Sequence, residues 1–196
     1  MTESMFNRNS TAMPSFMIKD AGKAIDFYKK VFDAKEKYRP DWNGKIMHAE
    51  LLIGNSTIML SDEMDMPGFC FMNPPTENNS QSNGCLFPFS LYVYVDNPDA
   101  VYKRAIDAKS RPLYEPENMF YGDRVGAFVD PFGFSWSVAK QVEEVSAEEI
   151  ERRLPTAMKE MSSKMQSGGN PETYKIKYLK YREKYLTLKK NHGKKN

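Results

Sequence analysis

The chain has 196 residues, of which 40% are hydrophobic and 28% charged, the composition of a soluble globular protein. This length accommodates one domain of about 130 residues with extensions, and no apolar run approaches the roughly 20 residues that a membrane helix requires. The formal net charge of +2 is uneven: residues 171–196 hold nine Lys and Arg against two Glu, so they carry +7 and the remainder −5.

The N-terminal segment and the cysteines indicate where the protein is located. Residues 1–11 are polar and lack the apolar stretch of a signal peptide, so we expect a disordered N-terminus. Cys70 and Cys85 are the two cysteines, and they form neither a disulfide framework nor a zinc motif. These features predict a cytoplasmic protein with free thiols.

One segment occurs twice. Residues 27–35 (FYKKVFDAK) recur as residues 101–109 (VYKRAIDAK), and each copy follows an alternating apolar run that ends in an acidic residue. A solenoid needs at least three shorter repeats to bury its faces. Two copies of strand-then-helix therefore predict a duplicated module, with a ligand site between the two halves.

The first unit, residues 12–62, begins with a short strand that ends at Asp20, a plausible N-cap for the helix that follows. Turn residues separate three later strands. The elements expected after the first strand are a helix over 21–33 and strands over 36–39, 46–53 and 56–62.

Residues 63–85 are rich in Pro, Gly, Asn and Ser and predict a linker, and residues 86–145 repeat the order of the first unit. We expect Asp96 or Asp99 to cap the second helix. The elements expected in this unit are a strand over 88–95, a helix that ends at Ala108, and strands over 111–115, 122–129 and 134–140.

A third helix is predicted from Ser146, because Ser146 and Glu149 form a capping-box pattern. Pro155 is expected to kink or end this helix, and a flexible break follows within the segment 146–169. The basic segment 170–196 spaces tyrosines like a short heptad seam. Three roles remain open for it: contact with nucleic acid, packing on the body or on a second tail, and a solvated appendage.

Several motifs together resemble the vicinal-oxygen-chelate superfamily, which includes glyoxalase I, extradiol dioxygenases and bleomycin- and fosfomycin-resistance proteins. The finer matches resemble its PhnB-like branch. The motifs are residues 24–28 (AIDFY), 44–51 (GKIMHAEL), 59–63 (MLSDE), 121–124 (YGDR), 130–134 (DPFGF) and 149–153 (EIERR).

This resemblance implies an α+β fold with two tandem βαβββ modules that form a cupped mixed sheet, helices on its outer face and further helices at the C-terminus. It also implies a small-molecule site inside the cup and a homodimer. In metal-dependent members, four side chains in the cup hold a divalent ion. Those positions fall on Met13, Leu60, Ser90 and Ser137. None is an imidazole or a carboxylate, so we predict no metal cofactor at this site.

Strand alternation identifies candidate residues in the cup. If Leu60 faces the cup, so does Asp62, while His48 and Glu50 face it from the neighbouring strand. His48 and Glu50 are predicted as a catalytic base–acid pair, or alternatively as a contact that satisfies buried polarity. Together with Asp62 they offer an alternative divalent metal site, although Asp62 also suits an exposed strand end.

The remaining candidates are predicted to bind the ligand. Arg124 suits an anionic group, or else pairs with Asp123 or Asp130 to fix a turn. The aromatic residues suit either a stacking platform or the core. The predicted ligand-binding residues are Asp62, Ser90, Tyr92, Tyr121, Arg124 and Trp136.

Two functions follow from these expectations, and a scaffold whose ancestral site has decayed is a third possibility. The first is a protein that binds a small molecule, such as an aromatic or cationic drug, without the usual metal site. The alternative is a metal-dependent lyase, isomerase or dioxygenase that uses His48, Glu50 and Asp62.

Overall fold

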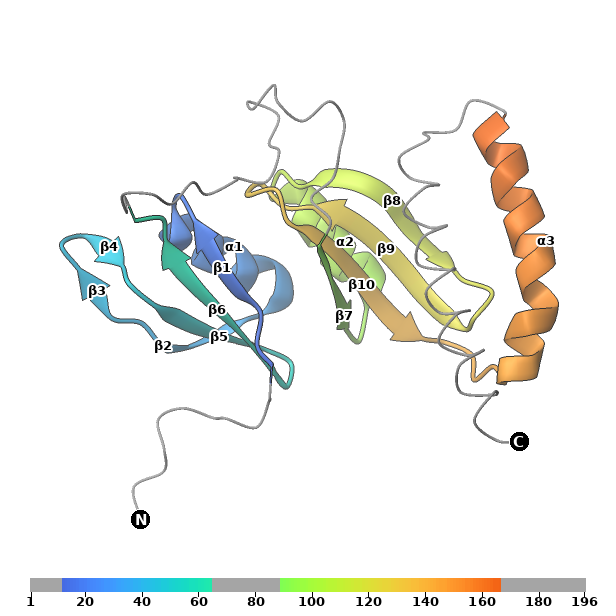
Figure 1. The fold of residues 1–196 in the computed structure, drawn as a ribbon, viewed down its shortest axis with the longest axis horizontal. Helices are drawn as coiled ribbons and strands as arrows, with labels where there is room; N and C mark the ends of the chain where they lie inside the picture. The colour runs from blue at the N-terminus through green and yellow to red at the C-terminus, as the bar shows by residue number, and fades with distance from the viewer. Residues whose placement is uncertain (1–11, 65–88, 167–196) are drawn as a thin grey trace, which may run out of the picture.

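The computed structural model describes residues 12–64 and 89–166, in which two βαβββ modules are followed by a long helix (Figure 1). The predicted α+β fold class is therefore confirmed. Predictions for the N-terminal segment 1–11, the linker, the two cysteines and the basic tail lie outside the described residues. Among the described helices, none is both long enough and apolar enough to cross a membrane.

The first module forms a four-stranded mixed sheet in the order β1-β6-β5-β2. Asp20 caps α1 as predicted, because its carboxylate accepts the N–H of Lys23 at 3.0 Å. The single strand expected over 46–53 is wrong: a separate hairpin, β3–β4, interrupts it. The elements are β1 (Ser15–Ile18), α1 (Ala21–Phe32), β2 (Lys35–Tyr38), β3 (Asp41–Trp42), β4 (Lys45–Ile46), β5 (Ala49–Ile53) and β6 (Ser56–Asp62).

The second module repeats this architecture with the strand order β7-β10-β9-β8. Its helix is capped by Asn97, whose side chain accepts the N–H of Ala100 at 3.0 Å, and not by Asp96 or Asp99. Pro98 occupies the first helical turn, where no backbone N–H is needed. The elements are β7 (Ser90–Tyr94), α2 (Pro98–Asp107), β8 (Arg111–Asn118), β9 (Asp123–Val129) and β10 (Ser135–Gln141).

The two modules share one hydrophobic core. Phe16 on β1 lies 6.4 Å from Trp136 on β10, measured between ring centroids, and Tyr28 on α1 lies 5.2 Å from the same indole. The core contains the helix-facing side of both sheets together with α1 and α2, which contact each other. Each sheet therefore turns its other side, its outer face, away from the other module. The sheets stay separate, so one chain alone does not close the expected cup.

Asp130 is the polar centre of this shared core. Its Oδ2 accepts the Tyr28 hydroxyl and the Trp136 indole N–H, both at 2.8 Å, so it joins the first module to the second. Its Oδ1 accepts the N–H groups of Phe132 and Phe134, both at 2.9 Å, which fixes the predicted turn before β10. Burial raises the pKa of Asp130 to about 6, although these four donors oppose the shift.

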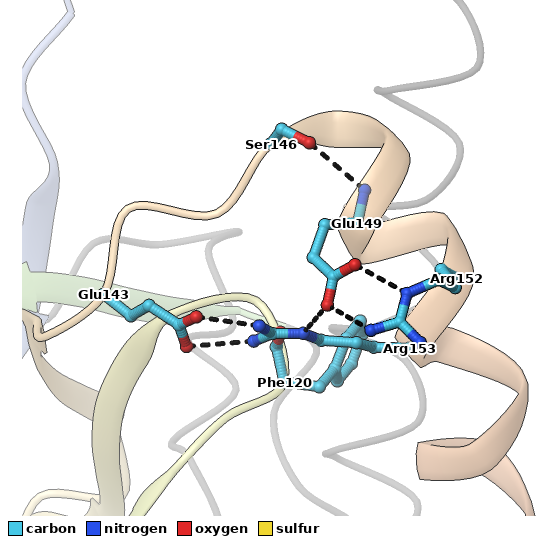
Figure 2. A network of polar contacts seen from close by, with 6 residues as sticks. All are labelled: Phe120, Glu143, Ser146, Glu149, Arg152 and Arg153. Atoms are coloured by element: carbon cyan, nitrogen blue, oxygen red, sulfur yellow. Dashed lines mark hydrogen bonds and ion pairs between the residues drawn. The ribbon is translucent and has the colours of Figure 1, made fainter.

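Helix α3 (Ala147–Gln166) follows the second module and is held by ion pairs (Figure 2). Arg153 donates to both carboxylate oxygens of Glu143 and also pairs with Glu149. Arg152 and Arg153 lower the pKa of Glu149 to about 2. The Ser146 hydroxyl accepts the N–H of Glu149 at 3.2 Å, as the capping-box pattern predicted.

Pro155 was expected to kink or end this helix, and of these two outcomes the second is wrong. The helix continues to Gln166, so part of the predicted flexible break is helical. Proline removes one backbone hydrogen bond, and apolar packing compensates on one side of the helix. Ile150, Leu154 and Met158 pack against the hydrophobic cluster on the outer face of the second sheet.

Candidate functional site

Two tyrosines and a buried aspartate form a cluster on the outer face of the second sheet. The strand register places Tyr92, Tyr94 and Asp123 on this face, opposite Ser137, Ala139 and Gln141 of β10. The hydroxyls of Tyr92 and Tyr94 both donate to Oδ2 of Asp123, at 2.9 and 3.1 Å. Asp123 is 4% exposed, whereas Tyr94 is 62% exposed. The cluster thus combines a buried carboxylate with an accessible aromatic ring.

The chemistry of the tyrosines follows from this arrangement. Burial raises the pKa of Tyr92 far above its ordinary value, and its contacts with Tyr121 and Asp123 raise it further. Burial and Asp123 also raise the pKa of Tyr94. Both hydroxyls therefore stay protonated and donate to Asp123, and their rings provide apolar contact surface.

Two of the other predicted ligand-binding residues belong to the same region. Ser90 is exposed on β7 and lies on the same face as Tyr92, opposite Ser135. The hydroxyl of Ser135 is buried and has no hydrogen-bond partner within the described part of the chain. Tyr121 is 6% exposed and packs in the hydrophobic cluster beneath Tyr92. The outer face consequently has hydrogen-bonding capacity that the protein does not use fully.

His48 and Glu50 come together on the outer face of the first sheet. His48 Nε2 lies 3.3 Å from Glu50 Oε1, and the side chains are 35% and 9% exposed. Tyr38 on β2 pairs with Glu50 in the strand register, and its ring centroid lies 6.4 Å from that of His48. A partly exposed imidazole beside a shielded carboxylate has the geometry of a base oriented by an acid.

The structure contradicts the expectation that Asp62 joins this pair. In β6, Leu60 aligns with Phe16 and Ala49 on the helix-facing side, so Asp62 faces that side too. Its Oδ1 accepts the N–H of Ala21 at 2.8 Å, and its Oδ2 accepts the N–H of Ile46 at 2.7 Å. Both oxygens therefore fix the start of α1 and the hairpin, and the alternative metal site does not assemble.

Arg124 and Trp136 also lie on the helix-facing side, away from the predicted ligand-binding face, and for Trp136 this confirms the alternative of a core residue. Arg124 pairs with neither Asp123 nor Asp130: its guanidinium donates to Asp99 of α2 and to Asn118. Trp136 is 1% exposed, and its indole N–H is bound to Asp130. Both residues stabilise the packing of helices on sheets instead of lining the outer face.

The metal positions of the resembled family remain unsuited to a divalent ion after this correction. The outer-face residues of β6 next to Leu60 are Met59 and Ser61, which supply a thioether and a hydroxyl. Ser90 and Ser137 add only hydroxyls. Among the described residues, no group of three or more His, Cys, Asp or Glu side chains is placed to hold a metal ion. The residues present do not fit the family's metal set.

Asp123 is the site residue that the sequence predictions missed. They treated Asp123 only as a partner for Arg124. Its alternation with Val125 and Ala127 on β9 places it on the same face as the tyrosines. Tyr38 was also missed as a neighbour of His48. Their contact depends on the register between β2 and β5, and the hairpin β3–β4 lies between these two strands in the chain.

Comparisons with known proteins agree with this architecture. Residues 11–138 match the model of the Glyoxalase/Bleomycin resistance protein/Dioxygenase superfamily. The uncharacterized proteins Mb0911c of Mycobacterium bovis and Rv0887c of Mycobacterium tuberculosis are each 37% identical over 142 residues, which is 72% of this chain and 90% and 80% of theirs.

Similar solved structures include TioX from Micromonospora sp. ML1, with 18% identity and a TM-score of 0.50 over 70% of this chain and all of that one. The PhnB protein from Bacillus cereus has 20% identity and a TM-score of 0.48 over 66% of this chain and 98% of its own. The family model covers well over half of the sequence and includes both modules. The chain therefore belongs to the Glyoxalase/Bleomycin resistance protein/Dioxygenase superfamily.

Proposed function

We propose that the protein binds a small aromatic or cationic molecule on the outer faces of its sheets, without the family's four-ligand metal site. The observation that carries this proposal is the pair of tyrosine hydroxyls that both donate to the buried Asp123. Aromatic rings attract cations through their electron-rich faces, and the buried carboxylate adds negative potential behind them. The negative charge of the body, −5 outside residues 171–196, favours the same class of ligand.

The site is completed by a second copy of the chain in this proposal. The His48–Glu50 pair and the Tyr92–Asp123 cluster lie on the outer faces of different sheets, and the shared core separates them. One ligand reaches both groups only if the first module of one chain faces the second module of its partner. A twofold homodimer creates two such sites, and each is enclosed more than an open sheet face allows.

The proposal predicts selective stabilisation by an aromatic cation. We expect ethidium to raise the melting temperature of the full chain, because a ligand of the native state stabilises it. Asp123→Asn removes the buried negative charge and should weaken ethidium binding at least tenfold. Asp99→Asn is the matched control, since it removes the same charge from the helix-facing side, where Asp99 pairs with Arg124.

Sedimentation and metal analysis test the other parts of the proposal. We expect a dimer by analytical ultracentrifugation at micromolar concentration. Stoichiometric nickel, zinc, manganese or iron in the purified protein, lost in His48→Ala, would overturn the metal-free proposal. Equal ethidium affinity in Asp123→Asn and Asp99→Asn would remove the tyrosine–aspartate cluster as the ligand site.

A second candidate function is metal-free acid–base catalysis. It rests on the 3.3 Å contact between His48 and Glu50, in which the less exposed carboxylate orients the imidazole. If ligand turnover is observed, we expect His48→Gln to abolish it while ethidium binding persists.

A further inference from the structure

A cleft with a volume of about 660 Å³ opens between the two modules, at the edge where β2 and α2 begin. The first module contributes Lys35 and Leu52, and the second contributes Tyr94, Ala100 and Lys140. This volume lies within the range of small-molecule sites, roughly 300–1,000 Å³. The cleft does not include the His48–Glu50 pair or Tyr92 and Asp123. It does adjoin the outer faces, because Lys35 and Leu52 share the sheet face of Glu50 and Tyr94 shares that of Tyr92.

The floor of the cleft is apolar. Phe32 and Val101, both buried, lie beneath it, and the half-buried Leu52 and Ala100 line it. The ring of Tyr94 adds an exposed aromatic wall. Such a floor gains free energy when an apolar body displaces water from it.

Among the charged side chains at the rim, Arg104 and Asp33 form an ion pair, whereas the two lysines do not pair within the described part of the chain. Arg104 donates to the backbone oxygen of Val31 at 2.7 Å and to Asp33 at 2.9 Å, so its charge is already used to hold α2 against α1. The side-chain ammonium groups of Lys35 and Lys140 form no hydrogen bond or ion pair with other residues of the described ranges 12–64 and 89–166.

Asp96 is the other charged residue at this rim, so the charges outside the Arg104–Asp33 pair are two positive and one negative. The cleft therefore has a surplus of positive charge above an apolar floor. This polarity is opposite to that of the buried carboxylate behind Tyr92 and Tyr94.

From these observations we propose that the cleft between the modules binds a small organic anion, with an apolar ring or chain on Leu52 and Ala100 and a carboxylate or phosphate between Lys35 and Lys140. The two ammonium groups attract the anion, and the low-dielectric floor strengthens that attraction relative to open water. Because both modules line the cleft, a bound anion would also stabilise their mutual arrangement.

Phenyl phosphate, an aromatic anion, tests this proposal in a titration of the full chain followed by ¹H–¹⁵N NMR at low ionic strength. We expect saturable shifts at the amides of Gly54, Asn97 and Ala100, which line the cleft. The double variant Lys35→Glu/Lys140→Glu should raise the dissociation constant at least tenfold. The matched control is Lys19→Glu/Lys159→Glu, since it makes the same charge change at exposed positions outside the cleft.

Ala100→Trp provides a test that leaves the charges unchanged. It fills the cleft from α2, where Ala100 is half-buried, and should abolish the saturable shifts while the remaining spectrum stays dispersed. Absence of saturation in the wild type, shifts confined to other surfaces, or equal weakening by the control variant would overturn the proposal. Ethidium binding at the outer face should survive the Lys35→Glu/Lys140→Glu change, so the two proposals fail independently.

Discussion

Replacing Asp130 by alanine is expected to lower the free energy of unfolding by about 3–5 kcal/mol, because four donors lose their acceptor inside the core. Two are side-chain donors, the Tyr28 hydroxyl and the Trp136 indole, and two are backbone N–H groups of the turn before β10. The substitution leaves both a cavity and unpaired polar groups in the core. Each of these lowers the free energy of unfolding. Urea unfolding at 25 °C measures the difference.

Asp99→Ala is the matched control. It removes the same side chain from the same module, but Asp99 is half exposed and pairs with Arg124 near the surface. Exposed ion pairs of this kind contribute about 0–1 kcal/mol. If the two variants lose similar amounts of stability, Asp130 does not organise the interface between the modules.

The pH dependence gives a second measure of the same carboxylate. Burial raises the pKa of Asp130 in the folded protein to about 6, above its ordinary value of 3.8. The stability that this proton binding contributes is fully present below about pH 4 and is lost as the pH rises through 6. Between pH 7.5 and pH 5, the wild type should therefore gain about 1 kcal/mol relative to Asp130→Asn. A gain by the variant instead would mean that the four donors dominate over burial.

The sequence predicted the parts of the fold that depend on local chemistry and on duplication. The repeat of residues 27–35 at 101–109 located both helices, and Asp20 capped the first of them as expected. The turn over 130–133 was also predicted, because Pro and Gly impose local backbone geometry. These signals depend only on residues close together in the sequence, so they can be interpreted without knowledge of the tertiary structure.

The candidate site was predicted less well, because facing depends on the register between strands. Leu60 was expected to face the cup, and Asp62, two residues further along the strand, was therefore expected to face it too. Leu60 is instead 1% exposed and packs with Phe16 in the shared core. A one-residue change of phase moves every side chain of a strand to the opposite face. His48 and Glu50 lie on the expected face, because the alternating apolar residues of β5 itself indicated which side of that strand is buried.

The sequence pattern could not predict how the two modules pack against each other. A duplicated module is compatible with sheets that face each other and with sheets that share their helix-facing sides. Here the contacts of Trp136 with Tyr28 and Phe16 select the second arrangement within one chain. The proposed ligand site consequently depends on assembly, whereas the proposed anion cleft belongs to the single chain.

Gly122→Ala is expected to be the second most damaging change, with a loss of about 2–4 kcal/mol in the free energy of unfolding. Gly122 has a φ of +95°, and a Cβ atom there would lie 2.2 Å from the backbone oxygen of Glu143. The Gly122 carbonyl also accepts the N–H groups of Val142 and Glu143, at 2.8 and 3.0 Å. Relief of the clash therefore requires the segment after β10 to move and to give up these hydrogen bonds.

Gly44→Ala separates this clash from the cost of the backbone conformation. Gly44 has a φ of +75°, but a Cβ atom there meets nothing within 4 Å, so only about 1 kcal/mol of conformational strain is expected. Because Glu143 also binds Arg153, displacement of this segment should release α3, and hydrogen exchange in residues 147–158 should accelerate only in Gly122→Ala (Figure 2). Equal losses in both variants would show that the segment after β10 yields to the new methyl group, and that Gly122 is needed only for its positive φ.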